Sequence, residues 1–164
     1  MIFRKLIPAV LAIVFSTNFS PAALAAISVG QKAPALVVTD LSGEKVDLSD
    51  MEGKTVIVTL WASWCQPCLE EIPALRDFYH KYEDKGIDII ALSFDRPHDK
   101  KAVQKIAATV DYHVAIASEA TTNGFDGTGS LPVTYVINDK GNVSAIFDDK
   151  PVSEKELVKA VFNN

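Results

Sequence analysis

The sequence predicts an α/β domain built on a mixed β-sheet that is flanked by helices. The apolar run at residues 55–60 is typical of a strand that is buried on both faces of a sheet, and residues 87–94 have the pattern of another strongly apolar strand. The amphipathic segment between them has apolar residues at helical spacing, which indicates a strand, helix, strand unit. The length of 164 residues, with 48% hydrophobic and 23% charged residues, matches a single globular domain.

A β-hairpin is expected ahead of this unit. Residues 36–39 and 45–48 have the pattern of short strands, and residues 41–44 supply turn chemistry between them. The buried run at 55–60 then leads the chain directly into Trp61-Ala-Ser-Trp-Cys65.

A long amphipathic helix is expected from Pro67 onward, because apolar residues recur every three or four positions with charged residues between them. Gly86 is expected to end this helix. The remaining elements follow the run at 87–94 in order: a helix at 99–110, a strand at 113–117, a Gly-rich connection at 121–130, a hairpin of strands at 132–138 and 143–147, and a last helix capped by Ser153.

The first 25 residues have the pattern of a secretory signal peptide. Arg4 and Lys5 precede an apolar run at 6–15, and a small-residue series at 22–26 favours cleavage after Ala25. The domain would then span residues 26–164, in an exported, periplasmic protein. The alternative is an N-terminal membrane anchor, although the apolar run is far shorter than the roughly 20 residues that span a bilayer.

The charge of the domain argues against a nucleic-acid partner. Without residues 1–25 the chain has 14 basic and 21 acidic side chains, a formal charge of −7. Binding to phosphates requires a basic surface, and no cluster of basic residues exceeds the pair Lys100-Lys101.

The strongest chemical signal is Cys65-Gln66-Pro67-Cys68, at the junction of a buried strand and a helix. Unpaired N–H groups and the dipole at a helix N-terminus stabilise a thiolate, which is the attacking species in disulfide exchange. Cys65 is therefore the candidate nucleophile and Cys68 the candidate resolving thiol, and together they would form a redox-active disulfide.

Two structural interpretations of this pair are weaker. A static disulfide that closes so short a loop removes little chain entropy, so it would stabilise the fold poorly. A structural zinc site needs four ligands, and the three histidines, His80, His98 and His113, are scattered along the chain. No metal site is predicted.

The segment Trp61-Ala-Ser-Trp-Cys-Gln-Pro-Cys-Leu-Glu-Glu-Ile-Pro-Ala-Leu75 resembles the active-site stretch of the TlpA/ResA-like thiol-disulfide reductases of the thioredoxin superfamily. The resemblance extends to Leu131-Pro132-Val133-Thr134 and covers essentially the whole domain. It implies a thioredoxin-like fold with a central mixed sheet, an N-terminal hairpin and an extra central strand near residues 113–117.

The resemblance also implies how a substrate is held. Pro132 would be a cis proline facing the cysteine pair, and the backbone of Leu131 would pair with an extended substrate. The other expected substrate contacts are Trp64, Gln66 and Pro67, whereas Trp61 is expected mainly to pack in the core.

Glu71 is a further candidate catalytic residue. It lies three positions after Cys68, on nearly the same face of the expected helix. Thioredoxins proper have a buried acid in the preceding strand, where this chain has Thr59, and Glu71 resembles the acid that this subfamily uses instead. The alternative is that Glu71, beside Glu70, only compensates charge at the helix N-terminus.

The expected function is reduction of disulfides in exported proteins, with Cys65 attacking, Cys68 resolving, Glu71 handling the proton and no organic cofactor. Apocytochrome c and copper-site proteins are the partners that the resemblance suggests, with a membrane electron donor that regenerates the dithiol. One alternative is a periplasmic oxidant that forms disulfides, although residues 94–118 are too short for the helical insertion typical of such oxidants. A second alternative is a redox-silent copper chaperone, which lacks the expected Met and His ligands.

Overall fold

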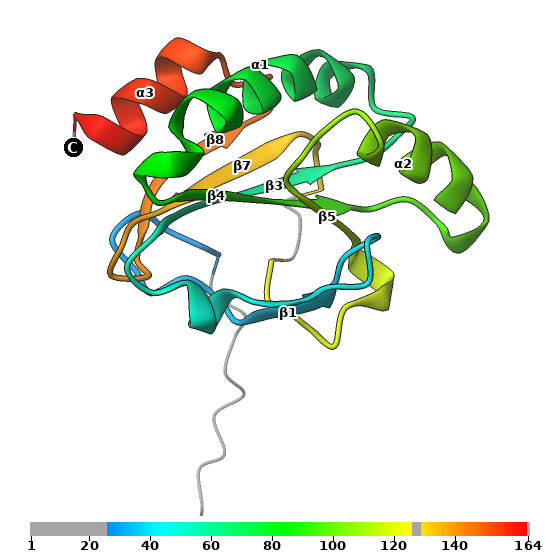
Figure 1. Cartoon of the computed structure of the whole chain (residues 1–164), viewed down its shortest axis with the longest axis horizontal. Coiled ribbons are helices and arrows are strands. Elements are labelled where there is room, and N and C mark those ends of the chain that lie inside the picture. The colour runs from blue at the N-terminus through cyan, green and yellow to red at the C-terminus, as the bar shows by residue number, and fades with distance from the viewer. Residues whose placement is uncertain (1–25, 126–128, 164) are drawn as a thin grey trace, which may run out of the picture.

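The computed structural model describes residues 26–125 and 129–163, and the signal peptide expected at 1–25 lies outside the described residues. The described chain forms three layers, with helices above a central sheet and a small sheet below it (Figure 1). In these two ranges no helix is both long and apolar enough to cross a membrane.

The central sheet has five strands in the order β5-β4-β3-β7-β8. β3 pairs in parallel with β4, and β4 pairs in parallel with β5. β7 pairs antiparallel with β3, and β8 pairs antiparallel with β7, so the sheet is mixed as the sequence predicts. The strands span Thr55–Trp61 (β3), Ile87–Ser93 (β4), His113–Ile116 (β5), Val133–Ile137 (β7) and Val143–Asp148 (β8).

Three α-helices cover one face of this sheet (Figure 1). They are α1 (Gln66–Tyr82), α2 (Lys100–Ala107) and α3 (Glu154–Phe162), and short 3₁₀ turns lie at Leu48–Met51, Glu83–Lys85, Pro97–Asp99 and Ala117–Glu119. α1 ends at Tyr82, and the 3₁₀ turn after it closes at Gly86, whose φ of 76° lies in the left-handed region that glycine adopts without strain. The Ser153 cap of α3 is present, as a capping box with Glu156.

The opposite face of the central sheet carries a second, three-stranded antiparallel sheet in the order β2-β1-β6. β1 (Leu36–Thr39) and β2 (Lys45–Asp47) form the expected hairpin. The two-residue strand β6 (Thr122–Asn123) lies within the predicted Gly-rich connection and pairs with β1, a long-range contact that periodicity does not reveal.

The extra strand near residues 113–117 is present as β5, but it lies at one edge of the sheet and not in its centre. β4 pairs with β3 on one side and with β5 on the other. α2 provides the crossover between β4 and β5, as parallel neighbours require.

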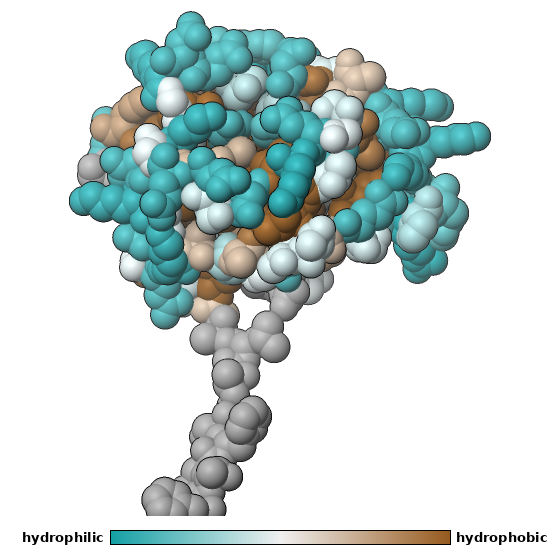
Figure 2. Space-filling model, turned by 60° about the horizontal axis from the view of Figure 1, so that its bottom comes forward, coloured by the Kyte–Doolittle hydropathy of each residue, from teal (hydrophilic) through white to brown (hydrophobic). Residues whose placement is uncertain are grey.

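Because both faces of the central sheet are covered, alternate residues of its strands enter two separate cores. In β3, Ile57 and Trp61 pack toward the helices, and Val56, Val58 and Leu60 pack toward the small sheet. This explains why the apolar runs are continuous in the sequence. Seen from the small-sheet side, the surface is mostly hydrophilic, and apolar atoms are visible mainly in a recess between polar side chains (Figure 2).

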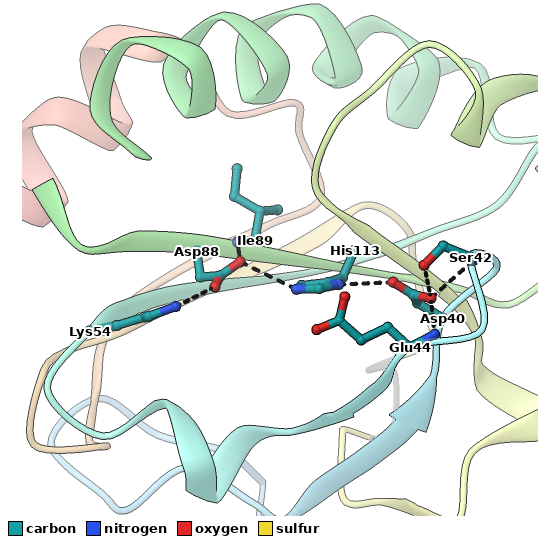
Figure 3. Close-up of polar contacts among 7 residues, drawn as sticks. All are labelled: Asp40, Ser42, Glu44, Lys54, Asp88, Ile89 and His113. Carbon is teal, nitrogen blue, oxygen red and sulfur yellow. Dashed lines mark hydrogen bonds and ion pairs between the residues drawn. The ribbon is translucent and has the colours of Figure 1, made fainter. Parts of the chain in front are cut away.

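A chain of polar side chains links the hairpin to the central sheet (Figure 3). Asp40 follows β1, and its Oδ2 lies 2.9 Å from Nδ1 of His113 on β5. The other ring nitrogen of His113, Nε2, lies 3.8 Å from Oδ1 of Asp88 on β4. Lys54 Nζ lies 3.1 Å from the other oxygen of Asp88. His113 is therefore part of a polar link between the two sheets, a role that its isolated position in the sequence does not indicate.

Candidate functional site

The cysteine pair lies at the N-terminus of α1, where the sequence places it. Cys65 is the N-cap residue, and its Sγ accepts a hydrogen bond from the backbone N–H of Cys68 at 3.3 Å. The two cysteines form a disulfide with their Cα atoms 5.3 Å apart. Cys65 retains 6% of its surface exposure and Cys68 only 1%, so an approaching substrate reaches Cys65 first.

A surface groove of about 560 Å³ opens beside Cys65. Trp64 is exposed at this groove, with 66% of its surface accessible. Four of the five residues expected to contact substrate line the groove, namely Trp64, Gln66, Pro67 and Leu131, together with Phe94, Gly129 and Ser130.

Pro132, the fifth expected contact, lies on the inner side of the disulfide. The peptide bond between Leu131 and Pro132 is cis. Pro132 is buried and lines a small cavity together with Cys68 and Glu71, whereas Leu131 lines the outer groove. The backbone at 131–132 therefore separates the groove from the buried acid.

Glu71 is buried in the core and retains 2% of its surface exposure, in contrast to the exposed Glu70. Its Oε1 accepts a hydrogen bond from the hydroxyl of Thr134 at 2.5 Å, and the Thr59 hydroxyl lies 3.5 Å from the same oxygen. Burial raises the pKa of Glu71 to about 7, although hydrogen bonds from Thr134, the Val152 backbone and Thr59 act in the opposite direction. Glu71 is therefore not a surface charge of the helix N-terminus.

Asp95, a residue that the sequence analysis did not single out, holds the loop that leads into Cys65. Its carboxylate accepts hydrogen bonds from the backbone N–H of Ser63 at 2.8 Å, from the Ser63 hydroxyl at 2.6 Å and from the Ser93 hydroxyl at 2.7 Å. Asp95 is 3% exposed. An aspartate directly after a predicted buried strand was the available signal, but its partner lies 32 positions earlier.

Tyr112 is a second residue that the sequence analysis did not single out. It lines the same cavity as Cys68 and Glu71 and is largely buried. Burial, followed by the charge of Glu71, raises the pKa of the Tyr112 phenol, so this side chain remains neutral at physiological pH.

The described residues contain one group of metal-binding side chain types that converge closely, Asp40, Glu44 and His113. This group belongs to the link between the two sheets (Figure 3) and does not include the cysteines. The chemistry at α1 is thus that of a disulfide, a groove beside its outer sulfur and a buried carboxylate behind its inner one.

A thioredoxin-like arrangement of strands and helices with a Cys-x-x-Cys disulfide at the N-terminus of α1 defines a thiol-disulfide oxidoreductase. Residues 29–146 match the AhpC/TSA family, and the chain belongs to this family of thioredoxin-like proteins.

The relatives are named for the same chemistry. The chain is 37% identical over 119 residues to the thiol-disulfide oxidoreductase ResA of Bacillus cereus, covering 71% of this chain and 68% of the relative. It is 35% identical to the thioredoxin-like protein YneN of Bacillus subtilis over 73% of this chain and 71% of the relative. Among solved structures, the thioredoxin domain of a thiol-disulfide oxidoreductase from Bacteroides vulgatus superposes with a TM-score of 0.65 and 27% identity, covering 82% of this chain and 99% of that domain.

Proposed function

We propose that this protein is an exported reductase of protein disulfides, in which Cys65 attacks, Cys68 resolves and Glu71 accepts the proton of Cys68. The observation that carries the proposal is the position of the disulfide between an outer groove and a buried carboxylate. Cys65 faces an incoming chain, and Cys68 faces the acid.

The assignment of Cys65 as nucleophile rests on exposure and on the helix terminus. Cys65 is the more exposed cysteine of the pair, and its Sγ already accepts an N–H of the first turn of α1. The same N–H groups stabilise negative charge on that sulfur in the reduced protein. An extended substrate segment in the groove would pair with the backbone of Leu131 and contact the exposed Trp64.

The reaction transfers two electrons from the dithiol to the substrate. The Cys65 thiolate attacks one sulfur of the substrate disulfide, which forms a mixed disulfide and releases the other substrate sulfur as a thiolate. Cys68 then gives its proton to Glu71 and attacks Cys65 Sγ, which releases the second substrate sulfur and closes the Cys65–Cys68 disulfide. An external dithiol returns the pair to the reduced form.

The reducing direction is supported by the charge around the pair. A thioredoxin-like protein becomes a strong oxidant when its reduced, thiolate form is stabilised. Here residues 66–72 contain no basic residue and Glu71 lies behind Cys68, so the ionised acid opposes thiolate formation. We therefore expect a reduction potential nearer to the about −270 mV of thioredoxin than to the about −120 mV of the oxidant DsbA.

Export rests on the sequence of residues 1–25, and the partners rest on the resemblance to the TlpA/ResA-like reductases. A cleaved signal peptide would place the domain in the periplasm, where disulfides persist and a reductase needs a membrane-bound electron donor. Its substrates would be exported proteins whose cysteines must be reduced before a centre is assembled, such as apocytochrome c or copper-site proteins.

Insulin reduction with dithiothreitol as electron donor tests the proposal. We expect the Cys65→Ser variant to lose activity to the uncatalysed rate, because no other residue can supply the attacking thiolate. Cys68→Ala should instead accumulate a mixed disulfide through Cys65 that survives non-reducing electrophoresis. Undiminished activity of Cys65→Ser would exclude the mechanism, and a potential near that of DsbA would favour the oxidant.

A further inference from the structure

Two buried hydroxyls of the central sheet converge on the carboxylate of Glu71. Thr59 on β3 and Thr134 on β7 are directly opposite each other in the antiparallel pair, and their hydroxyl oxygens lie 2.9 Å apart. Thr59 is 3% exposed and Thr134 is 1% exposed. The neighbouring residues that face the helices, Ile57 and Trp61 on β3 and Val136 on β7, are apolar.

Polar groups at this depth are costly unless they are hydrogen-bonded, so this pair requires a partner from the helix layer. Glu71 is that partner, because its Oε1 accepts from Thr134 at 2.5 Å and lies 3.5 Å from the Thr59 hydroxyl. Each hydroxyl has one proton, so Thr134 donates to the ionised Glu71 and accepts from Thr59. The result is an ordered chain from Thr59 through Thr134 to Glu71.

We propose that Thr134, supported by Thr59, is a positioning residue that holds Glu71 Oε1 and leaves Oε2 to receive the proton of Cys68. This inference rests on the proposed role of Glu71 as the proton acceptor. Among the described residues Oε2 has no hydrogen-bond partner in bonding geometry, although the Val152 N–H lies near enough to act on the carboxylate. Oε2 is therefore the oxygen that remains for the thiol.

The hydroxyl chain also sets how readily Glu71 acts as a base. Burial alone strongly favours the neutral acid, and donors to the ionised form oppose it. Thr134 is the largest of these opposing contributions and Thr59 is a smaller one, in line with their two distances to Oε1. Without Thr134, Glu71 would stay protonated at pH values where Cys68 must lose its proton.

The position of Thr134 places this control next to the substrate. Thr134 is two residues after Pro132, whose backbone neighbour Leu131 lines the groove at Cys65. The segment that carries the expected substrate contact, Leu131, thus leads directly into β7, the strand that carries the hydroxyl of Thr134.

The reaction of the reduced protein with Ellman's reagent, DTNB, separates the two thiols and tests the proposal. Attack by Cys65 releases one thionitrobenzoate and leaves a mixed disulfide, and attack by Cys68 on that bond releases the second. We expect the pH midpoint of the second phase to shift upward by roughly one to two units in Thr134→Val, since the ionised acid loses its strongest hydrogen-bond donor. The pKa of Glu71, followed by carboxyl ¹³C NMR of the disulfide form, should rise equally.

Matched variants separate positioning from packing. Thr134→Ser restores the hydroxyl and should restore the midpoint, and Thr59→Val should give a smaller upward shift. Thr55→Val makes the same change four residues earlier on β3, about 13 Å away at the rise of a strand, and should leave the midpoint unchanged. If Thr134→Val does not fold, Thr59→Val and Thr134→Ser decide the question alone.

Glu71→Gln distinguishes this proposal from the proposed function. Glu71→Gln should remove the Glu71-dependent part of the second-phase pH profile. The double variant that also carries Thr134→Val should have the same profile as Glu71→Gln alone. An altered profile in Glu71→Gln together with wild-type profiles in Thr134→Val and Thr59→Val would overturn the positioning role only. A wild-type profile in Glu71→Gln would overturn the role of Glu71 itself, and with it this inference.

Discussion

At the scale of single residues, the same side chain type takes different roles through burial alone. Glu70 and Glu71 are adjacent in the first turns of α1, yet Glu70 is exposed and Glu71 is enclosed between α1 and the central sheet. Enclosure raises the pKa of Glu71 to about 7, which is a suitable value for a group that exchanges protons near neutral pH.

The raised pKa of Glu71 predicts a pH-dependent stability of the disulfide form. A carboxyl whose pKa rises from 4.5 in the unfolded chain to about 7 on folding stabilises the fold below pH 4.5, and this contribution is lost as the pH rises through 7. At pH 8 the free energy of unfolding of Glu71→Gln should therefore exceed that of the wild type by about 3 kcal/mol, from the size of the pKa shift. Urea denaturation measures this difference as a higher midpoint of the variant.

The difference between Glu71→Gln and the wild type should disappear at pH 4, where the carboxyl is protonated in both states. Glu70→Gln is the matched control at an exposed position and should follow the wild type at both pH values. A constant difference between wild type and Glu71→Gln from pH 4 to pH 8 would contradict the raised pKa.

At the scale of elements, the reactivity of Cys65 depends on how the end of β3 meets the start of α1. The loop at residues 62–65 is fixed by Asp95, which follows β4 and binds both the backbone and the hydroxyl of Ser63. Parallel pairing of β3 with β4 brings the ends of these strands together, so Asp95 reaches a loop 32 positions away.

Removal of this contact should affect both stability and the site. Asp95→Ala leaves the donors of the half-buried Ser63 and the buried Ser93 without their acceptor, and an unpaired buried donor costs about 1–3 kcal/mol whereas one that water can reach costs less. We expect urea denaturation to show a loss of about 2–4 kcal/mol, and the first phase of the DTNB reaction to slow because the N-cap geometry of Cys65 loosens. Asp77→Ala, on the exposed side of α1, is the control and should change neither quantity appreciably.

At the scale of the whole molecule, the two sheets enclose a second core and are joined by the polar link of Figure 3. Asp40 accepts hydrogen bonds from the Ser42 backbone and hydroxyl and from the Glu44 N–H, in addition to its contact with His113. Burial raises the pKa of Asp40, but these hydrogen bonds outweigh it and hold the pKa below the usual 3.8.

The link between the sheets should therefore weaken in acid. A depressed carboxyl pKa stabilises the fold above the unfolded pKa of 3.8, and the contribution is lost as the pH falls through the lower, folded value. Asp40→Asn should destabilise the protein by about 1–3 kcal/mol at pH 7, with a smaller difference below pH 3. Thermal unfolding at both pH values measures this, with the exposed Asp50→Asn as control, and an equal loss at pH 7 and below pH 3 would refute it.

The sequence by itself determined the features that depend on local pattern. The continuous apolar runs of β3 and β4 and the helical spacing of α1 follow from which face of each element is buried, so they are readable without partners. The placement of Cys65 and Cys68 at the start of a helix follows from the same pattern.

Only the tertiary structure decided which distant residues meet. Thr134 and Glu71 are 63 positions apart, Asp95 and Ser63 are 32 apart, and His113 and Asp40 are 73 apart. Periodicity reports the face that an element buries and not the residue that it meets there, because the meeting is set by strand order and register. The redox pair could therefore be identified from its motif. Only the assembled sheet shows the hydroxyls that hold Glu71, the hydrogen bonds from Ser63 to Asp95 and the edge position of β5.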